Sequence, residues 1–416
     1  GGFLYLKSRQ PEIKTVFTTH ATTTGRSICF NGKNLYQYFE GYNGDQMAGE
    51  LGVLSKHSIE KAAAKNADLF TTVSDLTAKE CKQLLDVEAF VTPNGFDASF
   101  VPSGAAYTKA KKTAKDNLKK VAENLLGYSL SDNALMVATS GRFEWRNKGI
   151  DVFMNSLNRL ANNEGLEREV VAFIMVPSWV AGPREDLQKK LSKKCKCELE
   201  NRNITHWVNM PENNEICQAL GYYNMNNDQQ SKVKVIYVPC LLDGKDGIFN
   251  MTYYDLLAGL DMTVFASYYE PWGYTPLESA AFSVPSVTTD LAGFGLWVLD
   301  NTKGEANIDN GVAVIRRNDG NFDEVADSIV ASIIRLSKMS DAEVKSAQKN
   351  ALDFAKKASW DKFVKFYEKA YDKVLKSKPA KTDAVKESKP KATAKKVADK
   401  PKAEKKPAAK KTAAKK

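Results

Sequence analysis

The chain has 416 residues, which is enough for two domains of ordinary size, each with its own core. Its formal net charge of +10 comes from one segment, because residues 377–416 hold 15 lysines and four acidic residues and so carry +11. Residues 1–376 therefore sum to −1, which argues against a body that binds polyanions over a broad basic surface. No apolar run approaches the roughly 18 residues that cross a membrane, so the sequence predicts no membrane-spanning segment.

The tail at 377–416 consists mostly of lysine, alanine and proline, has almost nothing to bury, and is predicted to be disordered. Such a polycation either binds nucleic acid, acidic lipid or another polyanion through phosphates, or only adds solubility. Because the segment has no aromatic residue and no base-reading module, we favour solubility and expect at most weak nucleic-acid binding through it.

The cysteines are scattered and mostly have apolar neighbours: Cys29, Cys81, Cys195, Cys197, Cys217 and Cys240. This usage indicates reduced thiols in a cytoplasmic protein rather than a disulfide framework. Cys195 and Cys197 stand too close together, without a matching pair elsewhere, to predict a zinc site.

In chain order, short apolar runs alternate with amphipathic stretches. Strands are expected at 14–20, 67–74, 89–95, 134–142, 169–177, 233–239, 262–269 and 284–289. Helices are expected at 56–65, 75–85 and 149–163, and a further helical stretch at 183–200 suits either an oligomer contact or a solvated face. Strands this apolar are typical of parallel sheets that helices cover on both faces.

These patterns predict an α/β fold with two Rossmann-like domains in series and a linker near residues 99–112. We expect the remainder of an N-terminal domain at 1–128, a nucleotide-sugar-binding domain at 129–345, helices at 346–376 that pack back across the domains, and the tail at 377–416. We find no internal repeat.

Polar side chains follow several of the apolar runs, at the point where each strand is expected to end. They are His20, Asn94, Arg142 and Glu270. In parallel α/β sheets, ligands bind beyond the carboxyl ends of the strands. The four residues therefore point to one kind of site.

The sequence "GYTPLE" matches a helix start with a capping box. Thr275 would be the N-cap, Pro276 the first helical residue, and Glu278 the acceptor for the Thr275 N–H. This structural interpretation accounts for Glu278 but not for Glu270. A carboxylate beside a phosphate-binding helix N-terminus is unfavourable unless it faces hydroxyl groups or developing positive charge, and a sugar joined to that phosphate provides both.

Two cations occupy the sequence "SGRFEWRNKGIDVF": Arg142 at a strand end, and Lys148 just before a helix expected to begin near Gly149. Two positive side chains and a helix N-terminus would stabilise a leaving diphosphate. The alternative is a solvated loop with ordinary surface cations.

Several motifs together resemble glycogen synthases of the animal and fungal type, including shorter bacterial relatives. They are "FTTHATTTGR", "IEKAAAKNADLFTTVS", "VTPNGFD", "GRFEWRNKG", "VKVIYVP" and "SYYEPWGYTPLES…VPSVTTDLAGFG", in order between about residues 3 and 300. The resemblance implies two Rossmann-like domains facing a cleft (GT-B architecture). It also implies transfer of glucose from UDP-glucose to the non-reducing 4-OH of glycogen, an α-1,4-glucan, with retention and in the cytoplasm.

The resemblance assigns a role to each candidate residue. Glu270 would hold the hydroxyls of the donor sugar, and Glu278 the ribose. The diphosphate would bind the backbone N–H groups of Gly273, Tyr274 and Thr275, and the cationic side chains of Arg142 and Lys148. Tyr253 would stack on uracil. His20 would line the reacting sugar, with Arg26 and Asn94 nearby. Two of these residues also have a purely structural interpretation. His20 could be a histidine at a strand end whose hydrogen bonds are made within the fold, and Tyr253 could be an aromatic residue of the core. No metal or other cofactor is expected, because family members need none and the chain has no Asp-x-Asp pair.

Three departures from the family pattern qualify these expectations. The glycine-rich loop of the N-terminal domain is missing from a chain that opens at Gly1 without methionine, so we expect a longer parent, and this chain alone can be inactive even if that parent is an enzyme. The segment 341–375 has no arginine, which argues against control by glucose 6-phosphate. The Lys-rich tail has no recognised family counterpart.

Two other functions remain open. One is a different retaining glycosyltransferase, such as a sucrose- or trehalose-type synthase. The other is a catalytically degenerate protein that binds polyanions through its tail.

Overall fold

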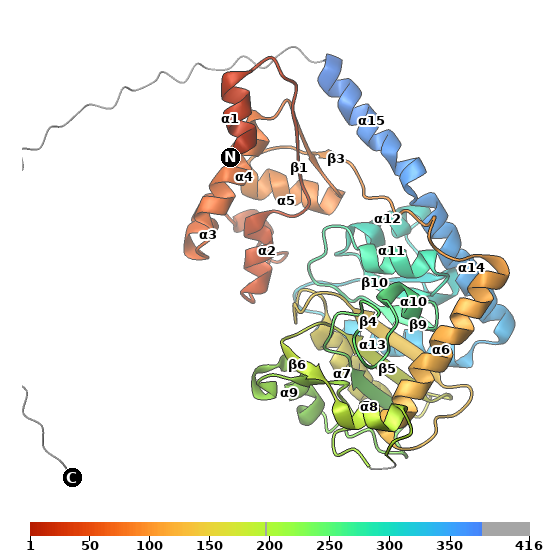
Figure 1. The fold of residues 1–416 in the computed structure, drawn as a ribbon. Coiled ribbons are helices and arrows are strands. Elements are labelled where there is room, and N and C mark those ends of the chain that lie inside the picture. Colours follow the sequence, from red (N-terminus) through yellow and green to blue (C-terminus); the bar gives the residue numbers. More distant parts are fainter. Residues whose placement is uncertain (196–197, 377–416) are drawn as a thin grey trace, which may run out of the picture. The chain divides into compact units, whose positions relative to one another are not determined.

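The computed structural model describes residues 1–195 and 198–376 (Figure 1). The predicted disordered tail at 377–416 and Cys197 lie outside the described residues. Within the described part of the chain, no helix is both long and apolar enough to cross a bilayer.

A six-stranded parallel sheet forms the larger α/β unit, with the strand order β11-β10-β9-β4-β5-β8. Its strands are β4 (Leu135–Ser140), β5 (Val170–Met175), β8 (Val233–Tyr237), β9 (Met262–Val264), β10 (Ser286–Thr289) and β11 (Val312–Ile315). The chain builds outward from β4 through β5 to β8, then returns to the other side of β4 with β9. This is the Rossmann order, in which the direction of growth reverses between β4 and β9.

Alternate residues of these strands pack into different cores. Val137 and Ala172 belong to a core shared with α7, α9 and α13, whereas Met136 and Phe173 belong to one shared with α6, α8 and α10. Successive side chains of a strand point to opposite faces, so both faces of the sheet are covered and the strands read as continuous apolar runs. The covering helices are α6 (Gly104–Leu126), α7 (Ile150–Ala161), α8 (Glu185–Leu191), α9 (Glu215–Tyr222), α10 (Tyr253–Leu257) and α13 (Phe322–Lys338).

A second, three-stranded parallel sheet has the order β1-β2-β3. Its strands are β1 (Val16–Thr19), β2 (Leu69–Thr72) and β3 (Phe90–Val91), and its helices are α1 (Gly2–Arg9), α2 (Thr23–Phe30), α3 (Gly44–Glu50), α4 (Leu54–Asn66) and α5 (Asp75–Leu85). Phe70 of β2 packs with Ala64 of α4 and with Cys81 and Leu85 of α5. The predicted α/β class with two parallel sheets is confirmed.

The remaining helices are α11 (Tyr274–Ala281), α12 (Gly293–Asn301), α14 (Asp341–Lys357) and α15 (Trp360–Lys376). Phe354 of α14 and Phe363 of α15 share a core with Trp272 and Phe294. The backbone also joins this region to the chain after β3, because the Phe96 N–H donates to the Ala358 carbonyl at 3.1 Å.

All eight predicted strands are present, although several are shorter than expected. The linker predicted near 99–112 is wrong, since α6 begins at Gly104 and buries Leu118 and Leu125 against the six-stranded sheet. Strand β11 and the antiparallel pair β6 (Val180–Pro183) and β7 (His206–Val208) were not foreseen. The domain boundary predicted after residue 128 stays a prediction.

Gly311 and Gly304 form a natural pair for testing the packing of α14. Both have a left-handed backbone, with φ of +85° and +90°. A Cβ on Gly311 would lie 2.3 Å from the Ala351 nitrogen and 2.5 Å from the Ala347 oxygen, whereas nothing lies within 4 Å of one on Gly304.

We expect Gly304→Ala to lower the free energy of unfolding by about 1 kcal/mol, the cost of left-handed backbone for a residue with a Cβ. Gly311→Ala should cost roughly 2 kcal/mol more, because the methyl group must displace the α14 backbone. Urea unfolding of both variants measures the difference. Equal losses would contradict close packing of α14 against Gly311.

Candidate active site

The reversal of strand order brings two loops together, one after β4 and one after β9. The first carries Arg142 and Lys148, and the second carries Glu270. Parallel strands present their carboxyl ends at the same edge of a sheet, so these loops meet where ligands bind in such folds. Of the four predicted strand-end residues, Arg142 and Glu270 lie in these two loops, and their sharing one site stays a prediction.

Backbone contacts lock the two loops to each other. The N–H groups of Tyr268 and Tyr269 both donate to the Asn147 carbonyl, at 2.9 and 3.1 Å. Gly149 follows with a left-handed φ of +69°, and a Cβ there would lie 1.8 Å from the Ala266 oxygen. The glycine that begins α7 is therefore required by the close approach of the second loop.

Lys148 and Glu270 form a direct ion pair between the loops. Both side chains are largely buried, with 19% and 15% of their surface exposed. Arg142 does not join this pair: it lies 3.1 Å from Glu144 and its side chain is 61% exposed. The structure therefore pairs one predicted cation, Lys148, with the predicted carboxylate, and pairs the other, Arg142, with Glu144.

A pocket of about 460 Å³ opens beside these loops at the ends of β4, β5 and β8. Its lining consists of Ser140, Gly141, Arg142, Phe143, Met175, Pro177, Cys240, Leu241, Leu242, Tyr253 and Thr275. Three predicted site residues, Arg142, Tyr253 and Thr275, contribute to this lining. Tyr253 accepts a 2.9 Å hydrogen bond from the Ser140 hydroxyl, and burial raises its pKa. Tyr253 also packs against the core under α10, as the structural alternative expected, while uracil stacking by its ring stays a prediction.

Helix α11 begins at the pocket, but not as predicted. Its N-cap is Gly273, which has a φ of +104° and provides no side-chain cap. Thr275 and Pro276 lie inside the first turn, and the Glu278 carboxylate accepts a 2.9 Å hydrogen bond from the Tyr254 hydroxyl instead. Burial raises the pKa of Glu278. The predicted capping box is therefore wrong, and the first N–H groups of α11 have no partner within their own helix.

The residues predicted to line the reacting sugar lie in the smaller α/β unit. His20 is exposed at the end of β1, with its Nδ1 3.4 Å from the Asn94 amide nitrogen. Asn94 is buried, and desolvation lowers the pKa of His20. Arg26 places its guanidinium 6.0 Å from the ring centre of Tyr269, the neighbour of Glu270. His20 and Asn94 thus lie together, and Arg26 borders the Glu270 loop.

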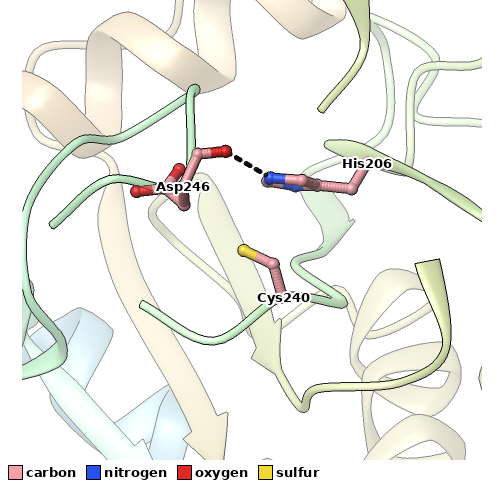
Figure 2. A group of neighbouring side chains, drawn as sticks. All are labelled: His206, Cys240 and Asp246. Atoms are coloured by element: carbon pink, nitrogen blue, oxygen red, sulfur yellow. Dashed lines mark hydrogen bonds between the residues drawn. The ribbon is translucent and has the colours of Figure 1, made fainter. Parts of the chain in front are cut away.

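His206, Cys240 and Asp246 are the described residues with the geometry nearest to a metal centre (Figure 2). Their ligand atoms lie within 4.8 Å of one another. However, His206 Nε2 donates to the Asp246 carbonyl at 2.8 Å, and the Asp246 carboxylate accepts from the N–H groups of Ile248 and Phe249 at 2.9 and 2.8 Å. Since hydrogen bonds occupy these atoms, a metal ion would have to displace them.

The cysteine prediction holds for four positions, because Cys29, Cys81, Cys217 and Cys240 are free thiols. Cys195 is not among them, and Cys197 lies outside the described residues.

One buried carboxylate near the site escaped prediction. Glu80 of α5 is buried, and its Oε1 accepts from the Thr22 N–H at 3.2 Å, from the Thr22 hydroxyl, and from the Tyr269 hydroxyl at 2.8 Å. Desolvation raises its pKa to about 7. The available signal was its position on the same helix face as Thr77 and Leu84, which are both buried.

Comparison with known proteins decides the family. The sequence model described as "Glycogen synthase" matches residues 1–186 and 186–416. The chain belongs to the glycogen synthase family. The resemblance inferred from its motifs is therefore confirmed.

Two relatives illustrate how much of a glycogen synthase the chain covers. The glycogen [starch] synthase of Neurospora crassa is 28% identical over 396 residues, which are 80% of this chain and 55% of that protein. Isoform 2 of Saccharomyces cerevisiae is 29% identical over 391 residues, 78% of this chain and 55% of that protein. The chain thus spans about half the length of these relatives.

A solved structure supports the fold. The N-terminal domain of Candida albicans trehalose-6-phosphate phosphatase superposes with a TM-score of 0.52 and 12% identity, covering 88% of this chain and 67% of that one. At this identity the likeness shows the fold alone, the α/β arrangement with parallel sheets that was expected for a glycogen synthase.

The position of Glu278 gives a prediction about this candidate site. Glu278→Ala and Tyr254→Phe should be non-additive in urea unfolding, with a coupling of about 1 kcal/mol, because both remove the same hydrogen bond. Glu278→Ala and Thr275→Ala should be additive. If Glu278→Ala were coupled to Thr275→Ala and not to Tyr254→Phe, the capping box would be supported after all.

The buried Glu80 gives a prediction about pH. In the unfolded chain its carboxyl titrates near 4.5, and in the folded chain at about 7, so folding takes up a proton between these values. The stabilising contribution of the neutral carboxyl is complete below pH 4.5 and is lost as the pH rises through about 7.

Relative to Glu80→Gln, which does not titrate, the wild type should therefore lose about 3 kcal/mol of unfolding free energy across this range. Urea unfolding of both proteins at each end of the range measures the change. A difference that does not vary with pH would show that the pKa of Glu80 is the same in the folded and the unfolded chain.

Proposed function

We propose that the protein transfers glucose from UDP-glucose to the non-reducing 4-OH of an α-1,4-glucan with retention of configuration. Family membership and relatives called glycogen [starch] synthase support this assignment. The observation that carries it is the ion pair between Lys148 and Glu270 at the reversal of strand order.

The ion pair suits a donor substrate with a negatively charged diphosphate and a sugar whose anomeric carbon becomes positively charged during transfer. When the diphosphate binds at the N-terminus of α11, it offers Lys148 a more highly charged partner than one carboxylate. Glu270 is then released toward the sugar, where it accepts hydrogen bonds from hydroxyls and faces the positive charge that develops at the anomeric carbon. Arg142, paired only with an adjacent loop residue, can turn to complete the cationic clamp.

The pocket at the β4, β5 and β8 ends suits the nucleoside. Its lining is mostly apolar with a few polar groups, as expected for an aromatic base held by specific contacts. Tyr253 contributes a ring for uracil, and Glu278 an acceptor for the ribose hydroxyls. The N–H groups of Gly273, Tyr274 and Thr275 face the diphosphate.

The reaction balances without an added cofactor. The bond from C1 of glucose to the diphosphate oxygen breaks, and UDP leaves with the electron pair. A bond from C1 to the acceptor O4 forms on the same face, and the hydroxyl proton leaves with the diphosphate. His20, Arg26 and Asn94 would surround the reacting sugar from the smaller α/β unit. We propose that no metal takes part, and that the setting is the cytoplasm.

A second candidate is another retaining transferase of the same architecture with a different acceptor. Only the donor site supports this second candidate, because such enzymes would share that site and differ in the acceptor. Polyanion binding by the tail is a separate candidate. Either removal of residues 377–416 or added salt would abolish this binding, whereas UDP binding in the pocket should survive both treatments.

Calorimetric titration with UDP and incorporation of labelled glucose into glycogen test the proposal on this chain. We expect UDP binding in the wild type, and a loss of transfer by roughly 10² or more in both Glu270→Gln and Lys148→Ala, because each removes charge that stabilises the transition state. EDTA should leave the rate unchanged.

Lys115→Ala is the matched control, because it breaks an ion pair of 2.8 Å with Asp261 in the same α/β unit without touching the pocket. It should leave transfer unchanged. UDP binding without transfer to glycogen, but with transfer to another sugar, would favour the second candidate. Failure to bind UDP at all would overturn the donor site.

A further inference from the structure

Glu80 connects two segments that carry predicted catalytic groups. Thr22 is the N-cap of α2 and follows His20 by two residues, while Tyr269 immediately precedes Glu270. One carboxylate oxygen of Glu80 accepts from both segments: from the N–H and hydroxyl of Thr22, and from the hydroxyl of Tyr269. The two segments are therefore tied through a single atom.

The surroundings of Glu80 are built to hold it. A Cβ on Gly25 would lie 2.3 Å from the same carboxylate oxygen, so glycine at this position makes room for it. The Thr22 hydroxyl also accepts the Gly25 N–H at 2.9 Å, which starts α2. A buried carboxylate is unfavourable unless donors surround it, and here three donors converge on one oxygen.

Tyr269 is held at both ends. Its hydroxyl donates to Glu80, and its N–H donates to the Asn147 carbonyl at 3.1 Å, next to Lys148. Removing the hydroxyl bond would leave the ring with its packing, its backbone and the Arg26 guanidinium 6.0 Å from its centre. Because Glu270 is the next residue, a shift of the ring would be passed to it.

We propose that Glu80 is a positioning residue for glucosyl transfer, which holds Tyr269 so that Glu270 faces Lys148 and the donor sugar. This inference rests on the proposed function of the same site. Glu80 contacts neither the pocket that suits the nucleotide nor the Lys148–Glu270 pair, so its effect passes through Tyr269 and Thr22. A merely structural Glu80 would stabilise the fold without influencing the Glu270 loop in particular.

Tyr269→Phe isolates the hydroxyl bond, and Glu80→Gln keeps an acceptor oxygen while Glu80→Leu removes it. Tyr107→Phe is the matched control, because its buried hydroxyl donates to the Phe282 carbonyl away from the site. Transfer rate, UDP affinity and hydrogen–deuterium exchange of the segments 20–27 and 266–275 are measured for each variant.

We expect Tyr269→Phe and Glu80→Leu to lower kcat by about tenfold or more, since small displacements of a reacting group are costly. UDP affinity should stay within about twofold, and exchange in 266–275 should accelerate. Glu80→Gln should retain most activity, and Tyr107→Phe should match the wild type in every readout.

The exchange measurement separates this inference from the proposed function. If the wild type transfers no glucose, faster exchange in 266–275 for Tyr269→Phe but not Tyr107→Phe still supports positioning by Glu80. Unchanged exchange in Tyr269→Phe overturns the inference even if transfer is observed. A fall in kcat that merely follows a fall in UDP affinity, or an equal effect of Tyr107→Phe, overturns it as well.

Discussion

The reversal of strand order between β4 and β9 is the constraint on which the site depends. In a parallel sheet that grows in both directions from its first strand, ligands bind in the crevice beyond the carboxyl ends of the two central strands, where the loops after these strands meet. Here those loops carry Lys148 and Glu270, and backbone hydrogen bonds from Tyr268 and Tyr269 to Asn147 hold them at one separation. The fold therefore brings Lys148 and Glu270 close together, and their opposite charges then form the ion pair.

The Lys148–Glu270 pair is better suited to being opened by a ligand than to stabilising the fold. A lysine and a carboxylate buried together lose much of their hydration, and their mutual attraction offsets this only in part. Such a pair is easily opened by a ligand with more charge and more hydrogen bonds to offer. The N-terminus of α11 at Gly273 adds backbone N–H groups near Glu270, so a diphosphate would find donors already in place there.

The sequence located those parts of the site that depend on local order along the chain. Glu270 could be found because it follows an apolar strand, and Lys148 because it directly precedes the expected start of a helix. The capping box proposed as the structural alternative for Glu278 was wrong, because "TPLE" fits one locally, whereas the Glu278 carboxylate binds the hydroxyl of a tertiary partner, Tyr254. Helix α6 was missed because its first turns are rich in alanine and lysine and resemble a solvated linker. Glu80 was missed because its partners lie 58 and 189 residues away in the chain.

The two tyrosines before Glu270 show how a short motif can serve several distant contacts. Tyr268 is buried, accepts the Leu35 N–H at 3.0 Å and donates to Asp319, while Tyr269 donates to Glu80. The two hydroxyls thus bind partners in different segments, Leu35 and Asp319 for Tyr268 and Glu80 for Tyr269. The residue that follows them, Glu270, is held by its ion pair with Lys148. The aromatic run thus orients the glutamate through its hydroxyl groups as well as through its buried rings.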